Sequence, residues 1–360
     1  MPDRYLSPDR FAELTARFPQ SNIAVIGDFF LDEYLILDKN LTEISLETGL
    51  EAYQVIATRK APGVAGTVTN ILRSLNVPVV AIGFSGDDGH GFELRRSLKN
   101  LGINLEHFAV FADRFTPTYT KPMLLENGCE TEQSRLDTKN RQPLQPDHEK
   151  QLIQSLRKVL PEVKAVLAID QAKGRNCGVI TDAVREELAA LAEQYPEKVF
   201  MADSRDYMSQ FKNAIVKFNI HEASKMVGLD HPNHSPEFVA QLSQRLFEYY
   251  QKPILLTLGA DGIQVTDKSG SAWIPGIHVS EPTDTVGAGD SVMASAGAAL
   301  SVGATMIEAA ILGNLTASLI IQQIGTTGIA TCQQLKDRFD ETRAWLNETI
   351  HISDPYSFTK

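Results

Sequence analysis

The sequence predicts an α/β fold with a mostly parallel central sheet and a small antiparallel β lid. Continuous apolar runs at residues 22–27, 79–84, 165–170 and 253–259 are typical of strands that are buried on both faces. Amphipathic segments of helical periodicity lie between such runs, for example at residues 181–193. Two stretches rich in Thr, Tyr and Val, at residues 33–60 and 114–137, break this alternation and predict the strands of the lid.

The composition excludes some classes of partner. The chain has 360 residues and a net charge of −11, which argues against nucleic acid or an anionic membrane surface as a partner. A phosphorylated small molecule stays compatible with this charge, because a helix N-terminus binds phosphate locally. The three cysteines lie far apart and the N-terminus has no apolar signal core, so we expect no disulfide framework and predict a cytoplasmic protein. Polar interruptions of the apolar segment at residues 294–321 predict buried helices there instead of a membrane span.

Polar side chains follow several of the predicted strands. Asp28 and Asp32 come directly after the first strand, and ligands of open α/β sheets bind outside the carboxyl ends of the strands. The alternative is that one carboxylate only closes the turn. After a later strand, Asn219 and Glu222 can hold a hydrated Mg²⁺ beside nucleotide phosphates. The alternative for this pair is a capping arrangement at the start of a helix.

A glycine-rich turn carries the strongest chemical signal. Residues 284–290 read Asp-Thr-Val-Gly-Ala-Gly-Asp, and a helical pattern of small apolar residues follows at once. The backbone N–H groups of Gly287, Ala288 and Gly289 would then lie at a helix N-terminus, which favours a bound phosphate. Asp290 can accept the proton of a hydroxyl that attacks this phosphate, and we expect the helix N-terminus to keep its pKa low. The alternative is that Asp290 only caps the helix.

This turn closely resembles the signature of the PfkB (ribokinase-like) carbohydrate kinases. The other motifs come in the order of that family between about residues 22 and 328, and their pattern is most similar to the heptose 7-phosphate kinase members. The resemblance implies a ribokinase-like three-layer α/β/α kinase domain at residues 20–345, with the lid over the sugar site. A short N-terminal helix and extension would occupy residues 1–19, and a loose tail residues 346–360.

The resemblance also implies a sugar site. Asp32, Gly63 and Asn70 match the family's sugar-binding positions, whereas Val64 and Thr67 stand where relatives have Gly and Asn. A valine does not easily adopt a positive φ, so these two departures leave the identity of the sugar open. If the substrate already carries a phosphate, we expect a cationic cluster to meet it, formed by Lys121 with Lys173 or Arg205.

The resemblance further implies a nucleotide site and its cations. ATP would contact residues that follow the later strands, with Mg²⁺ held through water by Glu222; these residues are Asn219, Glu222, Thr257, Gly259, Gly262 and Asn314. Asp284 would bind K⁺ together with carbonyl groups such as those of Val286 and Gly325. The alternative for Asp284 is that it only caps a turn.

Other classes of function stay open at this point. A nucleotide-binding dehydrogenase would need Gly-x-Gly-x-x-Gly after the first strand, and the residues after Gly27 lack it. A catalytically silent family member could bind sugar and nucleotide as a sensor or scaffold. His221, His231 and His234 are close in sequence, but their Pro-rich surroundings favour solvated loop residues over a metal site. We expect a small sugar or sugar phosphate as the partner, with no membrane or nucleic acid, and a homodimer formed through the β lid.

Overall fold

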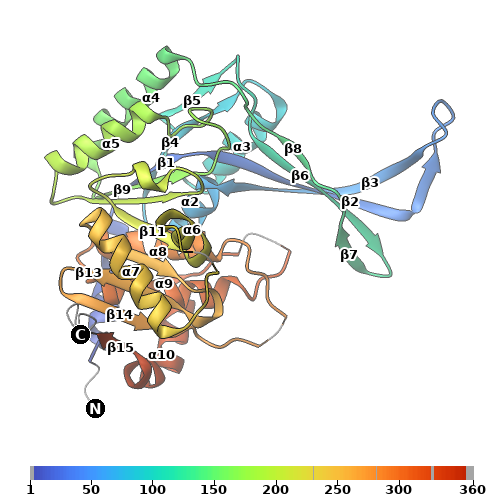
Figure 1. The fold of residues 1–360 in the computed structure, drawn as a ribbon. Helices are drawn as coiled ribbons and strands as arrows, with labels where there is room; N and C mark the ends of the chain where they lie inside the picture. Colours follow the sequence, from blue (N-terminus) through green and yellow to red (C-terminus); the bar gives the residue numbers. More distant parts are fainter. Residues whose placement is uncertain (1–3, 230, 281, 326–327, 354–360) are drawn as a thin grey trace.

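The central sheet of the protein has ten strands. The structure is a computed structural model and describes residues 4–229, 231–280, 282–325 and 328–353. The strand order is β15-β14-β13-β12-β11-β10-β9-β1-β4-β5 (Figure 1). Neighbours from β5 to β12 pair in parallel, and β13 to β15 are antiparallel. The strands are β1 (Ile23–Gly27), β4 (Val79–Gly86), β5 (Phe108–Phe111), β9 (Ala165–Asp170), β10 (Val199–Ser204), β11 (Ile215–Asn219), β12 (Ile254–Thr257), β13 (Ile263–Asp267), β14 (Gly270–Ile274) and β15 (His351–Ser353).

Helices cover both faces of this sheet and make a three-layer structure. Alternate residues of β1 enter different cores: Ile23 and Val25 join one hydrophobic cluster, and Ala24 and Ile26 join the other. The first face is covered by α1 (Pro8–Arg17), α2 (Ala65–Ser74), α3 (Gly89–Asn100), α8 (Ala288–Ser301), α9 (Met306–Ile320) and α10 (Cys332–Thr349). The second is covered by α4 (Pro146–Val159), α5 (Asp182–Gln194), α6 (Ile220–Val227) and α7 (Pro236–Tyr250).

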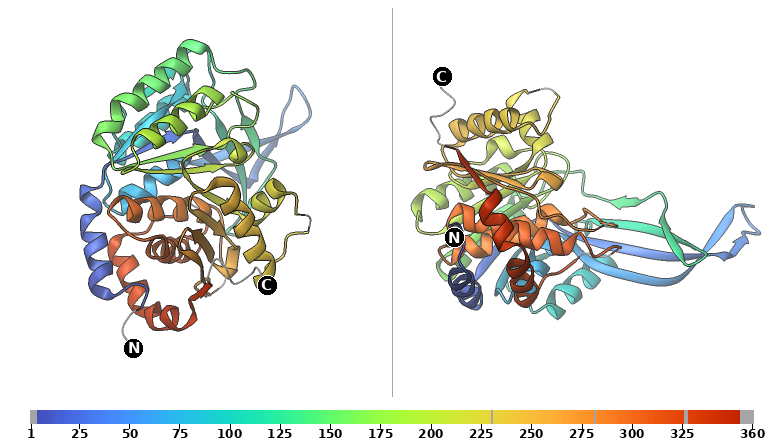
Figure 2. Two further views of the ribbon diagram at one scale, coloured as in Figure 1. Left: turned by 60° about the vertical axis from the view of Figure 1, so that its left-hand side comes forward. Right: turned by 90° about the horizontal axis from the view of Figure 1, so that it is seen from below.

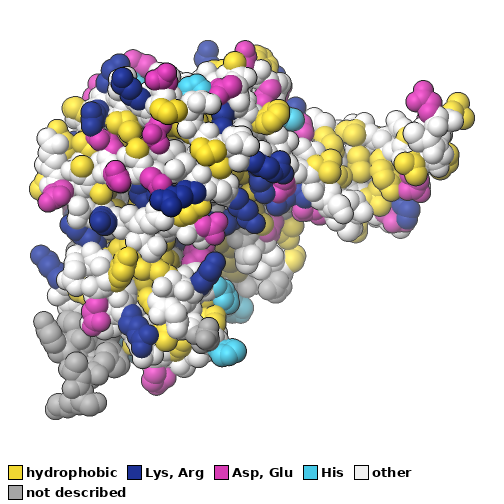
Figure 3. All heavy atoms as spheres, turned by 45° about the horizontal axis from the view of Figure 1, so that its top comes forward, with side chains coloured by type: hydrophobic (Ala, Val, Ile, Leu, Met, Phe, Trp, Pro, Cys, Tyr) yellow, Lys and Arg dark blue, Asp and Glu magenta, His cyan; other side chains and the backbone are white. Residues whose placement is uncertain are grey.

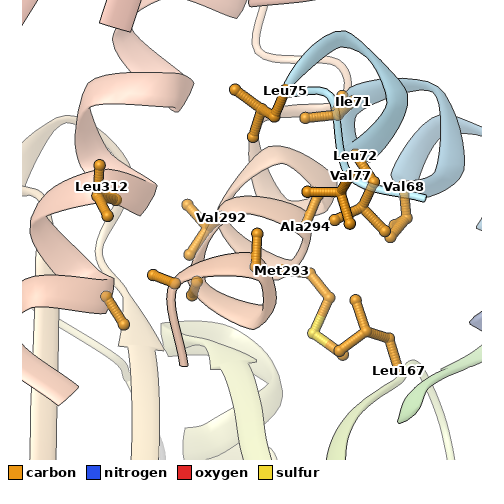
Figure 4. Close-up of a cluster of buried hydrophobic side chains, with 14 of the residues drawn as sticks. Val68, Ile71, Leu72, Leu75, Val77, Leu167, Val292, Met293, Ala294 and Leu312 are labelled. Atoms are coloured by element: carbon orange, nitrogen blue, oxygen red, sulfur yellow. The ribbon is translucent and has the colours of Figure 1, made fainter. Parts of the chain in front are cut away.

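The contact between α2 and α8 positions the glycine-rich turn. Figure 4 shows side chains of α2 facing those of α8, with Leu167 of β9 beneath them. The small residues of α8 let its backbone approach the sheet: a Cβ atom at Gly297 would lie only 2.8 Å from Leu167. Because α8 is buried against α2 and β9, its N-terminus is fixed relative to the carboxyl ends of the strands.

The lid is a second sheet that extends into a long arm. Its strands are β2 (Phe29–Ile44), β3 (Glu51–Val64), β6 (Thr118–Glu126), β7 (Cys129–Glu132) and β8 (Leu136–Thr138). The pairing is antiparallel except between β2 and β6, which run parallel. Figure 2 shows β2 and β3 projecting far from the body, and Figure 3 shows hydrophobic side chains along the arm. We expected this insert at residues 33–60, but β2 already begins at Phe29 and β3 ends only at Val64. The lid therefore follows β1 and precedes α2 almost without a connecting loop.

The two ends of the chain differ in detail from the sequence-based expectation. The N-terminal helix is present as α1, and its Phe11 ring stacks on Phe339 of α10 at 4.6 Å. Residues 346–353, which we expected in a loose tail, complete α10 and form β15 at the sheet edge, whereas residues 354–360 lie outside the described part of the chain. Within the described ranges, every helix is too short or too polar to span a membrane.

Candidate active site

The glycine-rich turn lies between α2 and the carboxyl end of β11. Gly287 adopts φ +81° and precedes α8, whose first residues are Ala288 and Gly289. A Cβ atom at Gly287 would lie 3.7 Å from the Thr67 side chain, and one at Gly289 would lie 2.9 Å from Nζ of Lys217. The N–H of Ala288 donates to the Thr285 carbonyl at 3.2 Å, whereas those of Gly287 and Gly289 have no partner among the described residues. These two N–H groups lie at a helix N-terminus beside a buried ammonium group, an arrangement that suits an anion.

Lys217 forms a buried ion pair beneath the turn. Its Nζ donates a hydrogen bond of 2.6 Å to Oδ2 of Asp203 on the neighbouring strand β10, and both side chains are less than 10% exposed. Burial lowers the pKa of Lys217, but Asp203, Glu222 and Asp290 raise it on balance. Lys217 thus stays charged among three carboxylates.

Asp290 occupies the first turn of α8 with a perturbed carboxyl group. It lies at the third helical position, and its carboxylate accepts no hydrogen bond from the described residues. Burial raises the pKa of Asp290 to about 7; the Lys217 ammonium opposes this rise, and the Asp203 and Asp32 carboxylates add to it. Our expectation of a low pKa was wrong, because desolvation and two nearby carboxylates outweigh the favourable helix N-terminus.

Asp32 and Gly63, both predicted to bind the sugar, meet where β2 and β3 pair. Asp32 is 9% exposed and accepts no hydrogen bond from the described residues, which leaves its oxygens available to ligand hydroxyl groups. Burial raises its pKa, although Lys121 and Arg135 oppose this. A Cβ atom at Gly63 would lie 2.7 Å from Oδ2 of Asp32, so this position requires glycine. Asn70, partly buried on α2, likewise forms no side-chain hydrogen bond with the described residues.

Val64 and Thr67 lie at the start of α2. Val64 precedes α2 with φ 60° and ψ −114°, a conformation that strains a β-branched residue. The sequence led us to expect that a valine would resist a positive φ, and here the surrounding structure imposes it. Thr67 is buried, and its Oγ1 reaches only the Pro62 carbonyl, at 3.5 Å.

The residues predicted for nucleotide binding gather at the ends of β11 and β12. Asn219 and Thr257 are register partners on these strands. Asn219 and Glu222 form a reciprocal capping box, with hydrogen bonds of 2.9 and 3.0 Å, so the structural alternative for this pair is present. Burial raises the pKa of Glu222, and Asp203 adds to the rise. This excess of negative charge suits a divalent cation, and the carboxylate and amide oxygens present are ligands that Mg²⁺ accepts.

A tight backbone contact forms the outer wall of this region. A Cβ atom at Gly262, which has φ +97°, would lie 2.1 Å from the Ile274 carbonyl oxygen. Similarly, one at Gly276 would lie 2.0 Å from the carbonyl oxygen of Ala260. Asn314 of α9 is buried and donates a 2.6 Å hydrogen bond to the Pro275 carbonyl. The turn that contains Gly259 and Gly262 is therefore fastened to α9 through residues 274–276.

Asp284 closes a turn ahead of the anion site. Its Oδ1 accepts a 3.0 Å hydrogen bond from the Val286 N–H, and its own N–H donates to the Ile321 carbonyl at 2.7 Å. The turn-capping alternative is thus present, and Asp284 also lies near the segment that was expected to supply carbonyl groups for K⁺. Thr326 and Thr327, which follow Gly325, lie outside the described residues.

The cations predicted to meet a substrate phosphate do not form one cluster. Lys121 is buried on β6 and donates to the Tyr34 hydroxyl at 3.1 Å; burial lowers its pKa, but Asp32 and Tyr34 raise it on balance. Lys173 instead lines a small recess with Lys139. Arg205 is exposed beyond β10, in a separate recess that Glu222 also lines. Lys121 is therefore the one of the three that stands beside Asp32.

Sequence reasoning missed two groups at the site and left another without a role. Lys217 and Asp203 were not singled out, although a charged residue within an apolar strand run is a usable signal. Asp28 accepts three backbone hydrogen bonds of 2.7–2.8 Å, from the N–H groups of Gln171, Ala172 and Val179, so it holds the loop after β9. His234 pairs with Asp261, and no cluster of metal ligands occurs among the residues that the structure describes.

Sequence comparison identifies the family. The model of the pfkB family carbohydrate kinases matches residues 21–332. The chain belongs to this family. Bifunctional protein HldE of Desulfatibacillum aliphaticivorans is 28% identical over 328 residues, covering 89% of this chain and 64% of the relative. Bifunctional protein HldE of Coxiella burnetii is 30% identical over 312 residues, covering 87% and 62%. The chain thus spans less than two-thirds of the length of these pfkB-family relatives.

Structural comparison agrees on the fold. A putative phosphofructokinase from Staphylococcus aureus superposes with a TM-score of 0.69 at 20% identity, covering 92% of this chain and 99% of that one. Arabidopsis thaliana ribokinase complexed with ribose and ATP gives 0.67 at 18% identity, covering 88% and 98%. At these identities the likeness establishes the fold alone, and it confirms the predicted ribokinase-like three-layer architecture.

Proposed function

We propose that this pfkB-family protein transfers the γ-phosphoryl group of ATP to a hydroxyl group of a sugar or sugar phosphate. One observation carries the proposal: Asp290, with a pKa near 7 and no hydrogen-bond partner among the described residues, stands at the start of α8 beside Lys217. A carboxyl group with a pKa near the working pH is suited to accept a proton in the transition state. A silent sensor would have no need of such a group.

The other residues take roles that follow from their positions. The free N–H groups of Gly287 and Gly289 would stabilise the charge that develops on the transferring phosphoryl group, with Lys217 beneath them. The N–H of Ala288 would join them by turning from the Thr285 carbonyl. Mg²⁺, held by Glu222 through water, would neutralise the phosphate oxygens of ATP. Opposite the nucleotide, Asp32 and Asn70 would orient the sugar so that its hydroxyl faces Asp290.

We further propose that the substrate carries a phosphate group, as a heptose 7-phosphate does. The similarity of the sequence motifs to heptose kinases supports this, and so does Lys121, which is buried beside Asp32. Two further cations, Arg135 and Lys139, lie over the Tyr119 ring. The Arg135 Cζ atom is 4.1 Å and the Lys139 Nζ atom 5.1 Å from the ring centroid. Both form ion pairs with Asp137, so Lys121 is the cation best placed to bind the substrate phosphate.

We also propose two features from the remaining expectations. K⁺ would bind near Asp284 and order the turn before α8. A homodimer would form through the lid, because the arm exposes an extended row of large hydrophobic side chains that a monomer leaves in water: Leu41, Ile44, Leu46, Leu50, Tyr53, Val55 and Ile56. Light scattering tests the dimer, and activity in K⁺ against a bulky organic cation tests the ion.

The experiment that tests the function is ADP release over a panel of sugars and matched sugar phosphates. We expect turnover with at least one sugar phosphate and a lower kcat/KM for the same sugar without phosphate. Lys121→Met should lower kcat/KM for the phosphate roughly 10- to 100-fold, the value of one charge-assisted contact. Lys336→Met, exposed on α10, is the matched control and should have no effect.

The possible outcomes separate the alternatives. No turnover with any substrate, despite binding of ATP and sugar, would support the sensor and contradict the kinase. Preference for the neutral sugar would keep the kinase and remove the phosphate pocket. If the phosphate is preferred but Lys121→Met behaves like the control, only the role of Lys121 falls.

A further inference from the structure

A cavity of about 480 Å³ lies between α7 and the antiparallel edge of the central sheet. This volume is within the range of small-molecule sites. Its walls come from α7, from the end of β12, and from β13, β14 and β15. The residues that line it are His234, Pro236, Val239, Ala240, Leu258, Asp261, Gln264, Trp273, His351 and Ile352.

The strand register places this cavity on the opposite face of the sheet from α9 and Asn314. Gln264 pairs with Trp273, and Trp273 pairs with His351, so these three side chains share one face. Ile263 and Ile274, on the other face, belong to the hydrophobic core beneath α9. The cavity is therefore separate from Asn314, although Asp261 belongs to the turn that borders both regions.

A carboxamide without a protein partner faces the cavity. Gln264 is 6% exposed and lines the cavity, yet its side chain forms no hydrogen bond with any described residue. Its amide atoms are not among the polar atoms that are closed off from solvent without a partner in the described residues, so they open into the cavity, where a ligand can pair with them. The amide offers one donor and one acceptor side by side, which matches a ligand edge with the complementary pair.

Aromatic rings make a flat wall beside this amide. The Trp273 and His351 rings stack with centroids 5.7 Å apart and planes within 6°. The indole N–H donates a 2.8 Å hydrogen bond to the Asp261 carbonyl, which fixes the orientation of Trp273. His234 pairs with Asp261 as well. The remaining lining is mainly aliphatic, so the cavity combines a planar aromatic surface with one amide.

We propose that this cavity binds a planar heteroaromatic molecule that carries an adjacent hydrogen-bond donor and acceptor on one edge. The ring would lie along Trp273 and the aliphatic wall formed by Val239 and Leu258, and its polar edge would pair with Gln264. Aromatic surface and a few convergent polar groups are the usual composition of such sites. This assignment is independent of the kinase chemistry.

The test uses quinazolin-4-one, a bicyclic ring with one amide edge, and the fluorescence of Trp273. The chain has two tryptophans, so Trp345→Phe leaves Trp273 as the sole reporter. With Mg·ADP at saturation, we expect saturable quenching by quinazolin-4-one. Gln264→Leu should weaken binding roughly 5- to 10-fold, the value of one lost buried hydrogen bond. Quinazoline, which lacks the amide edge, should bind both proteins equally, and Ala240→Trp should abolish binding by filling the cavity.

Four results would overturn the proposal. The first is no saturable quenching of the intact chain, and the second is equal affinity of quinazolin-4-one for wild type and Gln264→Leu. Loss of binding in Mg·ADP would assign the cavity to the nucleotide site. Binding that appears only after removal of residues 354–360 would make the chain's own C-terminus the occupant. Because Gln264→Leu is nearly isosteric, it decides the matter even if Ala240→Trp fails to fold.

Discussion

Removal of the Lys217 ammonium group tests how the charges beneath the glycine-rich turn are balanced. Lys217→Met keeps the aliphatic stem but leaves Asp203, which is 3% exposed, as a buried carboxylate without its partner. Breaking one side of a buried ion pair costs about 3–5 kcal/mol. We therefore expect a loss of about 3 kcal/mol in the free energy of unfolding, measured in urea at pH 8.

A double variant separates the ion pair from packing. Lys217→Met combined with Asp203→Asn removes both charges and keeps the volume of both side chains. It should recover most of the stability lost in the single variant, because replacing both members of a buried pair is far less costly than removing one. A double variant as unstable as the single one would show that packing, not charge, causes the loss.

The same variant should move the pH profile of the reaction. The Lys217 ammonium lowers the pKa of Asp290, so its removal should raise that pKa above about 7. Since Asp290 must be ionised to accept a proton, the acidic limb of kcat should shift to higher pH in Lys217→Met. A loss of stability below 1 kcal/mol together with an unmoved acidic limb would refute this account of the site.

Three further predictions concern particular residues. The pKa of Asp290 rises from 3.8 to about 7 on folding, so the stability that its protonated form contributes is lost as pH rises through about 7. At pH 8 the free energy of unfolding of Asp290→Asn should therefore exceed that of the wild type by about 1–3 kcal/mol. The same difference between the two proteins at pH 4 would contradict this prediction. Val64→Gly and Val64→Ala both remove the packing contacts of the valine side chain, but only glycine adopts φ 60° without strain. Val64→Gly should therefore be about 1–2 kcal/mol more stable than Val64→Ala, and equal melting temperatures would argue against strain at this position. Gly262→Ala, which would place a Cβ atom 2.1 Å from the Ile274 carbonyl oxygen, should raise KM for ATP at least tenfold. Gly303→Ala, at φ +92° with nothing within 4 Å and outside the proposed site, is the control and should leave KM unchanged; an unchanged KM in Gly262→Ala would remove the turn from the nucleotide site.

The parallel part of the fold was predictable from sequence because its strands are buried on both faces. β1 is an uninterrupted apolar run, β9 is apolar up to its last residue, Asp170, and every residue of both strands is buried. The arm was predictable only as a pair of inserted strands. Its length comes from the pairing of β2 with both β3 and β6, a long-range contact that no local pattern records. Likewise, residues 351–353 become a strand only because β14 offers an edge to pair with.

The candidate site divides in the same way. The turn at residues 287–289 could be predicted because the spacing of glycines indicates the backbone geometry, which is a local property. The pKa of Asp290 was not readable, since it depends on burial and on carboxylates from β2 and β10 that the fold brings together. Lys217 was missed for a related reason: a lysine in a strand is usually solvated, and only the adjacent β10 supplies the buried partner Asp203.

The most direct test of the central claim is the turnover of Asp290→Asn with the best substrate of the panel, measured alongside ATP binding. Asp147→Asn is the matched control, because Asp147 also lies in the first turn of a helix but is exposed on α4. If Asp290 accepts the proton of the attacking hydroxyl group, kcat should fall about 10²- to 10⁴-fold in Asp290→Asn while ATP still binds, and the control should keep its full rate. Near wild-type turnover in Asp290→Asn would contradict the account.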